Sequence, residues 1–234
     1  MQIQRFIIMS ERCTGSHFVQ YAMLENFFIE YSRRHHHLRH FFGHENDMAS
    51  YTEEEKQTML MICVVRNPVE WVDSFFKRKH HVPPENRHDI ERFLKREWYS
   101  IYEQGDKKGQ EIMEDRHFLT KKRYPHLLAL RETKHDYFLY LEKALHLFPH
   151  VLILKYEDLR DDYENTLESI QTRFQLRRKH PHEWKKIVRY KGTYHALYEK
   201  KPILLSPEIQ DYIWAHVNLE QEKTMGYTHE GKKK

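Results

Sequence analysis

The sequence predicts an α/β fold in which a central parallel sheet is covered by helices on both faces, a three-layer α/β/α arrangement. Two observations predict this class. Apolar runs that fit buried strands are each followed by a turn and a segment with helical periodicity, and this alternation repeats three times along the chain. Strands that alternate with helices form parallel sheets, and ligands bind at the carboxyl ends of their strands.

The first strand and helix are separated by a short loop. Residues 3–10, "IQRFIIMS", fit a buried strand, and "FVQYAMLENFFIEYSRR" from Phe18 places apolar residues at the three- and four-residue intervals of a helix. The loop between them, "ERCTGSH", therefore lies at a strand end.

Two further strand and helix pairs follow. Residues 59–65, "MLMICVV", fit a buried strand, a turn at Arg66-Asn67-Pro68 comes next, and "VEWVDSFFKRK" is an amphipathic helix with the proline near its first turn. The third strand is "HVLILKYEDL", residues 150–159, which leads into the helix "RDDYENTLESIQTRF".

The rest of the chain predicts additions to one domain that spans residues 1–234. Residues 85–149 contain no good strand and many charged helix formers, which indicates a helical insertion. Residues 178–204 are basic and irregular, and a last helix begins at Pro207 behind Ser206 as N-cap and runs to about Val217. The tail, residues 228–234, is expected to be solvated.

The composition is that of a globular protein. Of 234 residues, 39% are hydrophobic and 14% aromatic, which excludes the composition typical of disorder. The net charge of +4 does not demand nucleic acid, and two cysteines are too few for a disulfide framework. The longest apolar run falls far short of the about 20 residues of a membrane helix, and the N-terminus does not resemble a secretory signal, so we expect a cytoplasmic protein.

The first loop has the layout of an anion site. Backbone amides at a helix N-terminus bind anions, Gly15 permits a close backbone approach, and Thr14 and Ser16 add hydroxyl donors. A purely structural glycine turn is the alternative. The loop lacks the Gly-Lys-Ser/Thr ending of nucleotide-hydrolysing P-loops. A second anionic group fits Arg66, at a strand end, and Ser74, eight residues further along the next helix.

Four segments together resemble the sulfotransferases that use 3′-phosphoadenosine 5′-phosphosulfate (PAPS). The loop "ERCTGSHF" is similar to the first motif of that family, and "RNPVEWVDS" matches both ends of the second. The third and fourth similarities are "KYEDL", residues 155–159, and the closing "EQEKTMGY". The resemblance implies a P-loop-like sulfotransferase fold and transfer of a sulfonate to a hydroxyl or amine, with 3′-phosphoadenosine 5′-phosphate (PAP) as product and no metal.

The resemblance also implies which residues bind the donor. Arg66 and Ser74 would hold the 3′-phosphate, and Tyr156 would lie by the adenine. Lys191, in "RYKGTY", matches part of a loop that closes over the 3′-phosphate. The 5′-phosphosulfate would be held by the first loop, that is by Arg12, Cys13, Thr14, Gly15, Ser16 and His17.

The loop departs from the family at one position. With Gly15 aligned to the family glycine, Cys13 stands where the family has a basic residue. We expect Arg12 to supply the catalytic charge, because sulfonate transfer passes through a loose transition state that needs positive charge near the leaving oxygen. The alternatives are another cation, or Cys13 as a nucleophile, which the reaction does not require.

Transfer to a hydroxyl also needs a base, and histidines gather in residues 33–46, "RRHHHLRHFFGHEN". We choose His44, which lies 22 residues before Arg66, similar to a histidine in the family, and hold His40 in reserve. His35, His36 and His37 fit a solvated helix end. A zinc site of His36, His40 and His44 is an alternative, but Gly43 argues against a continuous helix there.

Two other functions remain as alternatives. A small-molecule kinase fits the fold class but lacks the P-loop lysine, and a nucleic-acid-binding module fits the basic and aromatic residues 178–201 but shows no recognition motif. The acceptor, a small molecule or glycan, would be lined by the insertion. Its aromatic residues Phe93, Trp98, Tyr99 and Tyr102 are better explained as core, and its basic residues Arg116, Lys121, Lys122 and Arg123 as a solvated face or as contacts to an acidic glycan.

Overall fold

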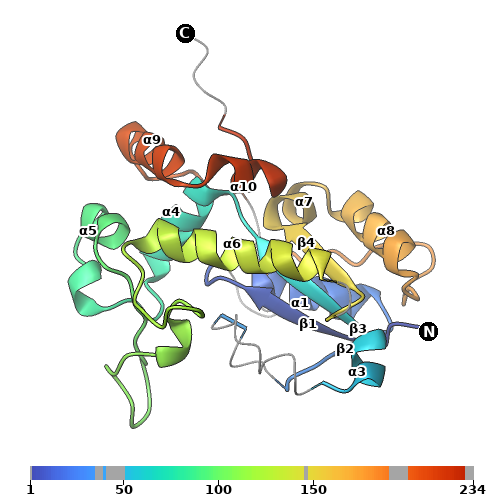
Figure 1. Ribbon diagram of the computed structural model, residues 1–234. Coiled ribbons are helices and arrows are strands. Elements are labelled where there is room, and N and C mark those ends of the chain that lie inside the picture. The colour runs from blue at the N-terminus through green and yellow to red at the C-terminus, as the bar shows by residue number, and fades with distance from the viewer. Residues whose placement is uncertain (1, 35–38, 41–50, 145–146, 190–199, 230–234) are drawn as a thin grey trace. The chain divides into compact units, whose positions relative to one another are not determined.

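The computed structural model describes residues 2–34, 39–40, 51–144, 147–189 and 200–229 (Figure 1). It has an α/β architecture with a four-stranded parallel sheet and helices, which confirms the predicted class. The chain divides into two compact units. The first unit holds the described residues within 2–40, 51–66 and 138–202, and the second holds those within 67–137 and 203–229. The organisation as one domain stays a prediction.

The first unit contains the sheet, with strand order β2-β1-β3-β4 and every neighbouring pair parallel. The strands are β1 (Arg5–Ser10), β2 (Glu30–Tyr31), β3 (Met59–Val65) and β4 (Val151–Lys155). Every residue of β3 is buried, as expected of a central strand whose sequence is one uninterrupted apolar run. In the register of the sheet, Ile62 of β3 lies between Ile8 of β1 and Leu152 of β4.

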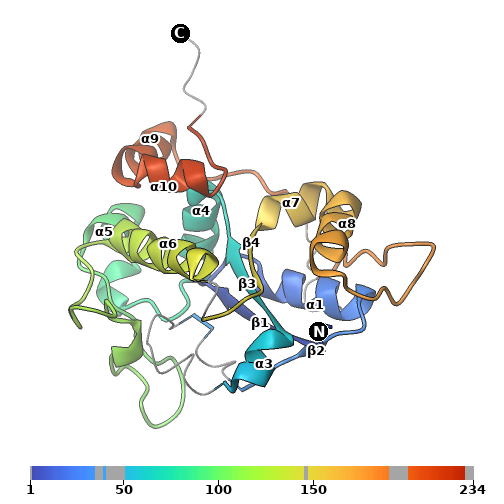
Figure 2. The same cartoon turned by 45° about the vertical axis from the view of Figure 1, so that its right-hand side comes forward.

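Helices of the first unit lie on both faces of its sheet (Figures 1 and 2). They are α1 (Ser16–Asn26), α3 (Glu53–Gln57), α7 (Tyr156–Asp161), α8 (Tyr163–Phe174) and residues 138–143 of α6 (Leu127–Lys143). On one face, the apolar side chains of β1, β3 and β4 form a buried cluster with α1 and α8. On the opposite face, burial and then the charge of Glu142, in α6, raise the pKa of Cys63.

Two predicted boundaries in the first unit are wrong. The helix after the first loop ends at Asn26 instead of continuing past residue 30. Beyond it the backbone is extended at Phe27 and pairs with residues 177–179, and the Asn26 side chain bonds both the N–H and the C=O of Lys185. The chain then forms the edge strand β2. The segment "YEDL" was predicted as the end of a strand, but β4 stops at Lys155 and Tyr156 begins α7.

The second unit is helical, with short irregular connections. Its elements are α4 (Pro68–Arg78), the 3-10 helices Pro84–Asn86 and Met113–Asp115, α5 (Ile90–Lys95), residues 127–137 of α6, α9 (Pro207–His216) and α10 (Leu219–Thr224). The predicted starts of α4 and α9 are confirmed: Asn67 caps α4 with Pro68 as its first residue, and the Ser206 hydroxyl accepts the N–H of Ile209 in α9.

The insertion is only partly helical. Between α5 and α6 the chain makes isolated antiparallel bridges, such as Trp98 with Tyr124, although a helical insertion was expected over residues 85–149. Phe93 and Trp98 are fully buried and in edge-to-face contact, which places them in a core, whereas Tyr99 and Tyr102 are half-buried.

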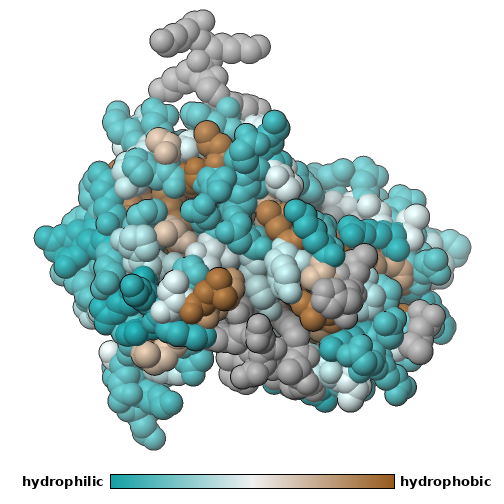
Figure 3. All heavy atoms as spheres, viewed as in Figure 1, coloured by the Kyte–Doolittle hydropathy of each residue, from teal (hydrophilic) through white to brown (hydrophobic). Residues whose placement is uncertain are grey.

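The surface drawn in Figure 3 is mostly hydrophilic, with apolar side chains in separate small patches. Within the part of the chain that the structure describes, every helix is too short or too polar to cross a lipid bilayer.

Candidate functional site at the ends of β1, β3 and β4

The sheet topology marks one edge of the first unit as the place for a ligand. The chain leaves β1 for β2 on one side, whereas β3 is followed by β4 on the other side. The carboxyl ends of β1 and β3 therefore flank a topological switch point, where ligands bind in open α/β sheets. The loop of residues 11–17 follows β1, and Arg66 follows β3.

The first loop has an unusual backbone. Cys13 and Gly15 both have positive φ, 65° and 96°, so the chain turns sharply before α1 begins at Ser16. The buried Thr14 hydroxyl donates to the Glu11 carbonyl at 2.8 Å and holds the turn closed. Gly15 occupies the N-cap position of α1, which has no side-chain cap and no acidic residue in its first turn. The amides at this end of the helix are thus not capped by their own N-cap side chain.

Arg12, the predicted catalytic cation, is bound within the loop. Its side chain is 2% exposed, and its Nε donates to Glu11 Oε1 at 2.6 Å. The backbone N–H of Arg12 donates to the same oxygen at 2.7 Å. Glu11 therefore offsets the charge of Arg12 in this conformation, and the catalytic role of Arg12 stays a prediction.

Arg66 joins the first loop to the start of α7. Its Nη1 donates to the Cys13 carbonyl at 3.1 Å, and its guanidinium carbon lies 4.6 Å from the centre of the Tyr156 ring. Tyr156 is buried against Gly15 so closely that a Cβ on the glycine would lie 2.2 Å from Tyr156 Cδ2. The structure thus brings together residues of the first three of the four similar segments, although they are far apart in the sequence.

A second arginine, which the sequence analysis did not single out, lies near Tyr156. The guanidinium carbon of Arg160 is 5.4 Å from the ring centre, and its Nε and Nη2 donate to the carboxylate of Asp161. The sequence signal was its place in "YEDLR", one turn beyond Tyr156 on what proved to be a helix.

Three further side chains lie beside the loop. Arg39 Nη2 is 3.2 Å from Nε2 of His17, and Arg39 Nε donates to Nε2 of His40 at 3.3 Å. Burial, and then the charge of Arg39, hold the pKa of His40 well below its usual value. His40, the reserve base, is therefore neutral, and both its ring nitrogens are engaged in this conformation.

The remaining predicted site residues belong to the second unit or lie outside the described residues. Ser74 lies half-buried in α4, in the second unit. His44 and Lys191 lie outside the described residues, as do His35, His36 and His37. Across the described ranges, no three His, Cys, Asp or Glu side chains gather as metal ligands.

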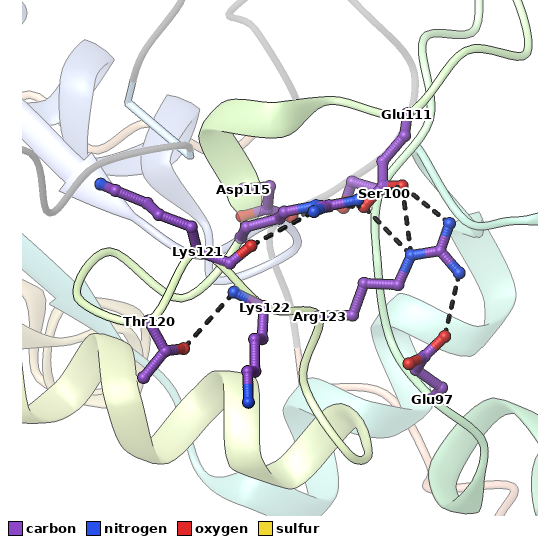
Figure 4. Close-up of polar contacts among 9 residues, drawn as sticks. Glu97, Ser100, Glu111, Asp115, Thr120, Lys121, Lys122 and Arg123 are labelled. Carbon is purple, nitrogen blue, oxygen red and sulfur yellow. Dashed lines mark hydrogen bonds and ion pairs between the residues drawn. The ribbon is translucent and has the colours of Figure 1, made fainter.

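In the second unit, basic residues of the insertion are paired with acids. Arg116 and Arg123 both donate to the carboxylate of Glu111, and Arg123 also contacts Glu97 at 2.9 Å (Figure 4). Burial would raise the pKa of Glu111, but the two arginines lower it to about 2. These two arginines therefore have a local structural role.

The second unit also buries two complete ion pairs on α6. Arg131 donates twice to Glu222 of α10, at 2.6 and 2.7 Å, and all four groups of the two pairs are at most 4% exposed. Lys134 contacts Asp115 at 2.7 Å, and Ser100 donates to the same aspartate. Sequence periodicity gave no signal of these pairs, because the partners lie up to 91 residues apart.

Comparisons with known proteins do not assign the chain to a family: no protein-family model matches it, and no curated protein matches it significantly.

Proposed function

We propose that the protein is a sulfotransferase that uses PAPS as sulfonate donor. The observation that carries this proposal is the meeting of three motifs at one sheet edge. Arg66 binds the loop carbonyl of Cys13 and lies over Tyr156, whose ring packs on Gly15. The parallel sheet with its switch point at this edge is the architecture on which a P-loop-like sulfotransferase fold is built.

In this proposal the chain binds two anionic groups and an aromatic base. The amides at the start of α1, with Thr14 and Ser16, bind the 5′-phosphosulfate. Arg66 and Ser74 bind the 3′-phosphate, and Tyr156 lies by the adenine. Because Tyr156 now packs on Gly15, its ring moves or shares this surface when the nucleotide enters.

The proposed transfer is an in-line displacement. The acceptor oxygen attacks sulfur, the bond from sulfur to the bridging oxygen breaks, and the acceptor proton passes to a base, for which His44 is our candidate. Negative charge develops on the departing phosphate, so the cations around the loop stabilise the transition state more than the ground state.

Isothermal titration with PAP tests the proposal. We expect the wild type to bind with micromolar affinity, about 8 kcal/mol, and Arg66→Ala to lose most of this affinity. Arg177→Ala is the matched control, since its guanidinium lies 4.5 Å from the Phe28 ring in the same unit, much as Arg66 lies over Tyr156. Thermal unfolding of each variant shows whether it is folded.

Two outcomes contradict the proposal. One is a folded wild type that does not bind PAP. The other is binding that Arg66→Ala and Arg177→Ala weaken equally. A wild type that binds ATP more tightly than PAP would instead favour the kinase alternative.

A further inference from the structure

Arg39 is held beside the first loop by contacts of the backbone and of its neighbour. The N–H of Ser10, the last residue of β1, donates to the Arg39 carbonyl at 3.0 Å. The ring of His40 donates from Nδ1 to the Ser10 carbonyl at 2.8 Å. Residues 39 and 40 thus lie along the end of β1, immediately before the loop.

The hydrogen bonds define how the two imidazoles act. A ring nitrogen that contacts a carbonyl carries the proton, so His40 has Nδ1–H and its Nε2 accepts from Arg39 Nε. By the same reasoning, Nε2 of His17 accepts from Arg39 Nη2. Both rings therefore present lone pairs to one guanidinium and fix its position.

The start of α1 lies beside this guanidinium. His17 is the second residue of α1, an 11-residue helix whose N-terminal end carries partial positive charge. After burial, the charges of Arg39 and Arg12 lower the pKa of His40 and the charge of Glu11 raises it, so two cations and one anion lie near this ring. An anion bound here would be attracted by Arg39 and by the helix end together.

A buried hydroxyl supplies an independent observation. The side chain of Ser10 is fully buried, and its Oγ has no hydrogen-bond partner among the described residues. Side chains alternate along a strand, so Ser10 faces the same side as Phe6 and Ile8, which pack with α1. A donor that lacks a partner in the described chain therefore faces the side of the sheet on which α1 begins.

We propose that Arg39 is the cation of the 5′-phosphosulfate site, the charge that the loop lacks at Cys13, with His17 and His40 as its positioning residues. The inference rests on the proposed function and names a residue for its missing cation. Arg12 donates to the buried Glu11, and Arg39 is held by two imidazoles beside the start of α1.

A pair of nucleotides isolates the contribution of Arg39. PAP carries both phosphates, and adenosine 3′-monophosphate lacks only the 5′-phosphate. We expect Arg39→Gln to weaken PAP about tenfold or more, as loss of a charged hydrogen bond does, and to leave the monophosphate unchanged. Arg39→Lys should recover part of the loss, because it keeps the charge but not the fork that binds two rings.

A control variant and two contrary outcomes complete this test of Arg39. Arg34→Gln removes an exposed arginine paired with Glu55 in the same unit and should change neither affinity. If the wild type binds PAP but Arg39→Gln weakens both nucleotides equally or neither, Arg39 is not the cation and the proposed function stands. If the wild type binds neither nucleotide, the proposed function fails. Titration of the same variants with pyrophosphate then tests the anion site by itself. Pyrophosphate binding that Arg39→Gln weakens would support an anion site at Arg39, and no such binding would overturn it.

Discussion

The two units of the chain handle buried and half-buried cations differently. In the second unit, Arg131 and Lys134 each contact a buried carboxylate directly. The first unit also holds a buried pair, Arg12 with Glu11, but Arg66 contacts a carbonyl and an aromatic ring, and Arg39 contacts two imidazoles. A buried cation matched by a carboxylate has its desolvation offset within the fold. In our proposal, Arg66 and Arg39 instead act on a bound anion, which would separate them from the charges that build the fold.

The largest expected effect is on stability, in the second unit. Glu222→Ala leaves the buried Arg131 without its carboxylate, and we expect the free energy of unfolding to fall by about 3–5 kcal/mol. Urea unfolding at pH 7 measures this, with Glu220→Ala, exposed on the same helix, as control. Arg131→Met combined with Glu222→Leu should recover most of the loss. A cost below about 1 kcal/mol for the single variant would mean that the pair does not hold the unit together.

The next effect concerns the backbone of the first loop. Gly15→Ala places a Cβ 2.2 Å from Tyr156 at a φ of 96°, so we expect a loss of about 2 kcal/mol or more in unfolding free energy and loss of PAP binding. Gly105→Ala is the matched control, because its φ is also positive, 74°, but nothing lies within 4 Å of the added carbon. It should cost only the backbone strain, about 1 kcal/mol. Equal losses in the two variants would argue against close packing of Tyr156 on the loop.

Acid should weaken the fold through a histidine in each unit. Burial and the charge of Arg39 lower the pKa of His40, and burial and the charge of Arg131 lower that of His135, although Glu222 lies 3.7 Å from the latter. The unfolded chain takes up protons below about pH 6.5 while these folded rings do not, so stability is present above that pH and lost as the pH falls. Each ring lowers the free energy of unfolding by up to about 1.4 kcal/mol for each pH unit below about 6.5.

His135→Gln tests this in the second unit. Between pH 7.5 and 5, the variant's unfolding free energy, measured in urea, should depend on pH with a slope reduced by nearly one proton. His88→Gln, at an exposed position, controls for the substitution itself. A variant slope equal to that of the wild type would show that His135 gains its proton in the folded state.

Local patterns predicted the elements that carry the candidate site. The uninterrupted run "MLMICVV" predicted β3 with its bounds, and the turn at Asn67-Pro68 predicted the start of α4. Both signals depend only on residues that are adjacent in the sequence. The Asn26 helix end and the "YEDL" helix were missed. Beyond Asn26 the backbone pairs with residues 177–179, a contact that leaves no local signal in the sequence.

The candidate site was predictable only in outline. The alternation of strands and helices predicted that the first loop and Arg66 lie at neighbouring strand ends, and the family resemblance added Tyr156 to the same site. Neither predicted that Glu11 binds Arg12, or that Arg39 reaches His17, because both follow from side-chain packing. In residues 33–46 the histidines have the chemistry expected of a base, whereas no local pattern marks Arg39 among them.

The smallest expected effect lies in the insertion, where a basic run proved to be partly an ion network. Above about pH 4.5 the ionised Glu111 binds Arg116 and Arg123, and this stabilisation is lost as the pH falls toward its folded pKa of about 2. Glu111→Gln should therefore cost about 1 kcal/mol at pH 7, because the two pairs are partly exposed. Glu97→Gln removes the outer partner of Arg123, whose carboxylate side chain is 60% exposed, and should cost less than about 0.5 kcal/mol. Urea unfolding at pH 7 compares the free energies of unfolding of the two variants.

If both variants lose the same unfolding free energy, the network is a solvated surface and does not order the insertion. If Glu111→Gln loses more, Arg116 and Arg123, once open to an acidic-glycan interpretation, act within the fold.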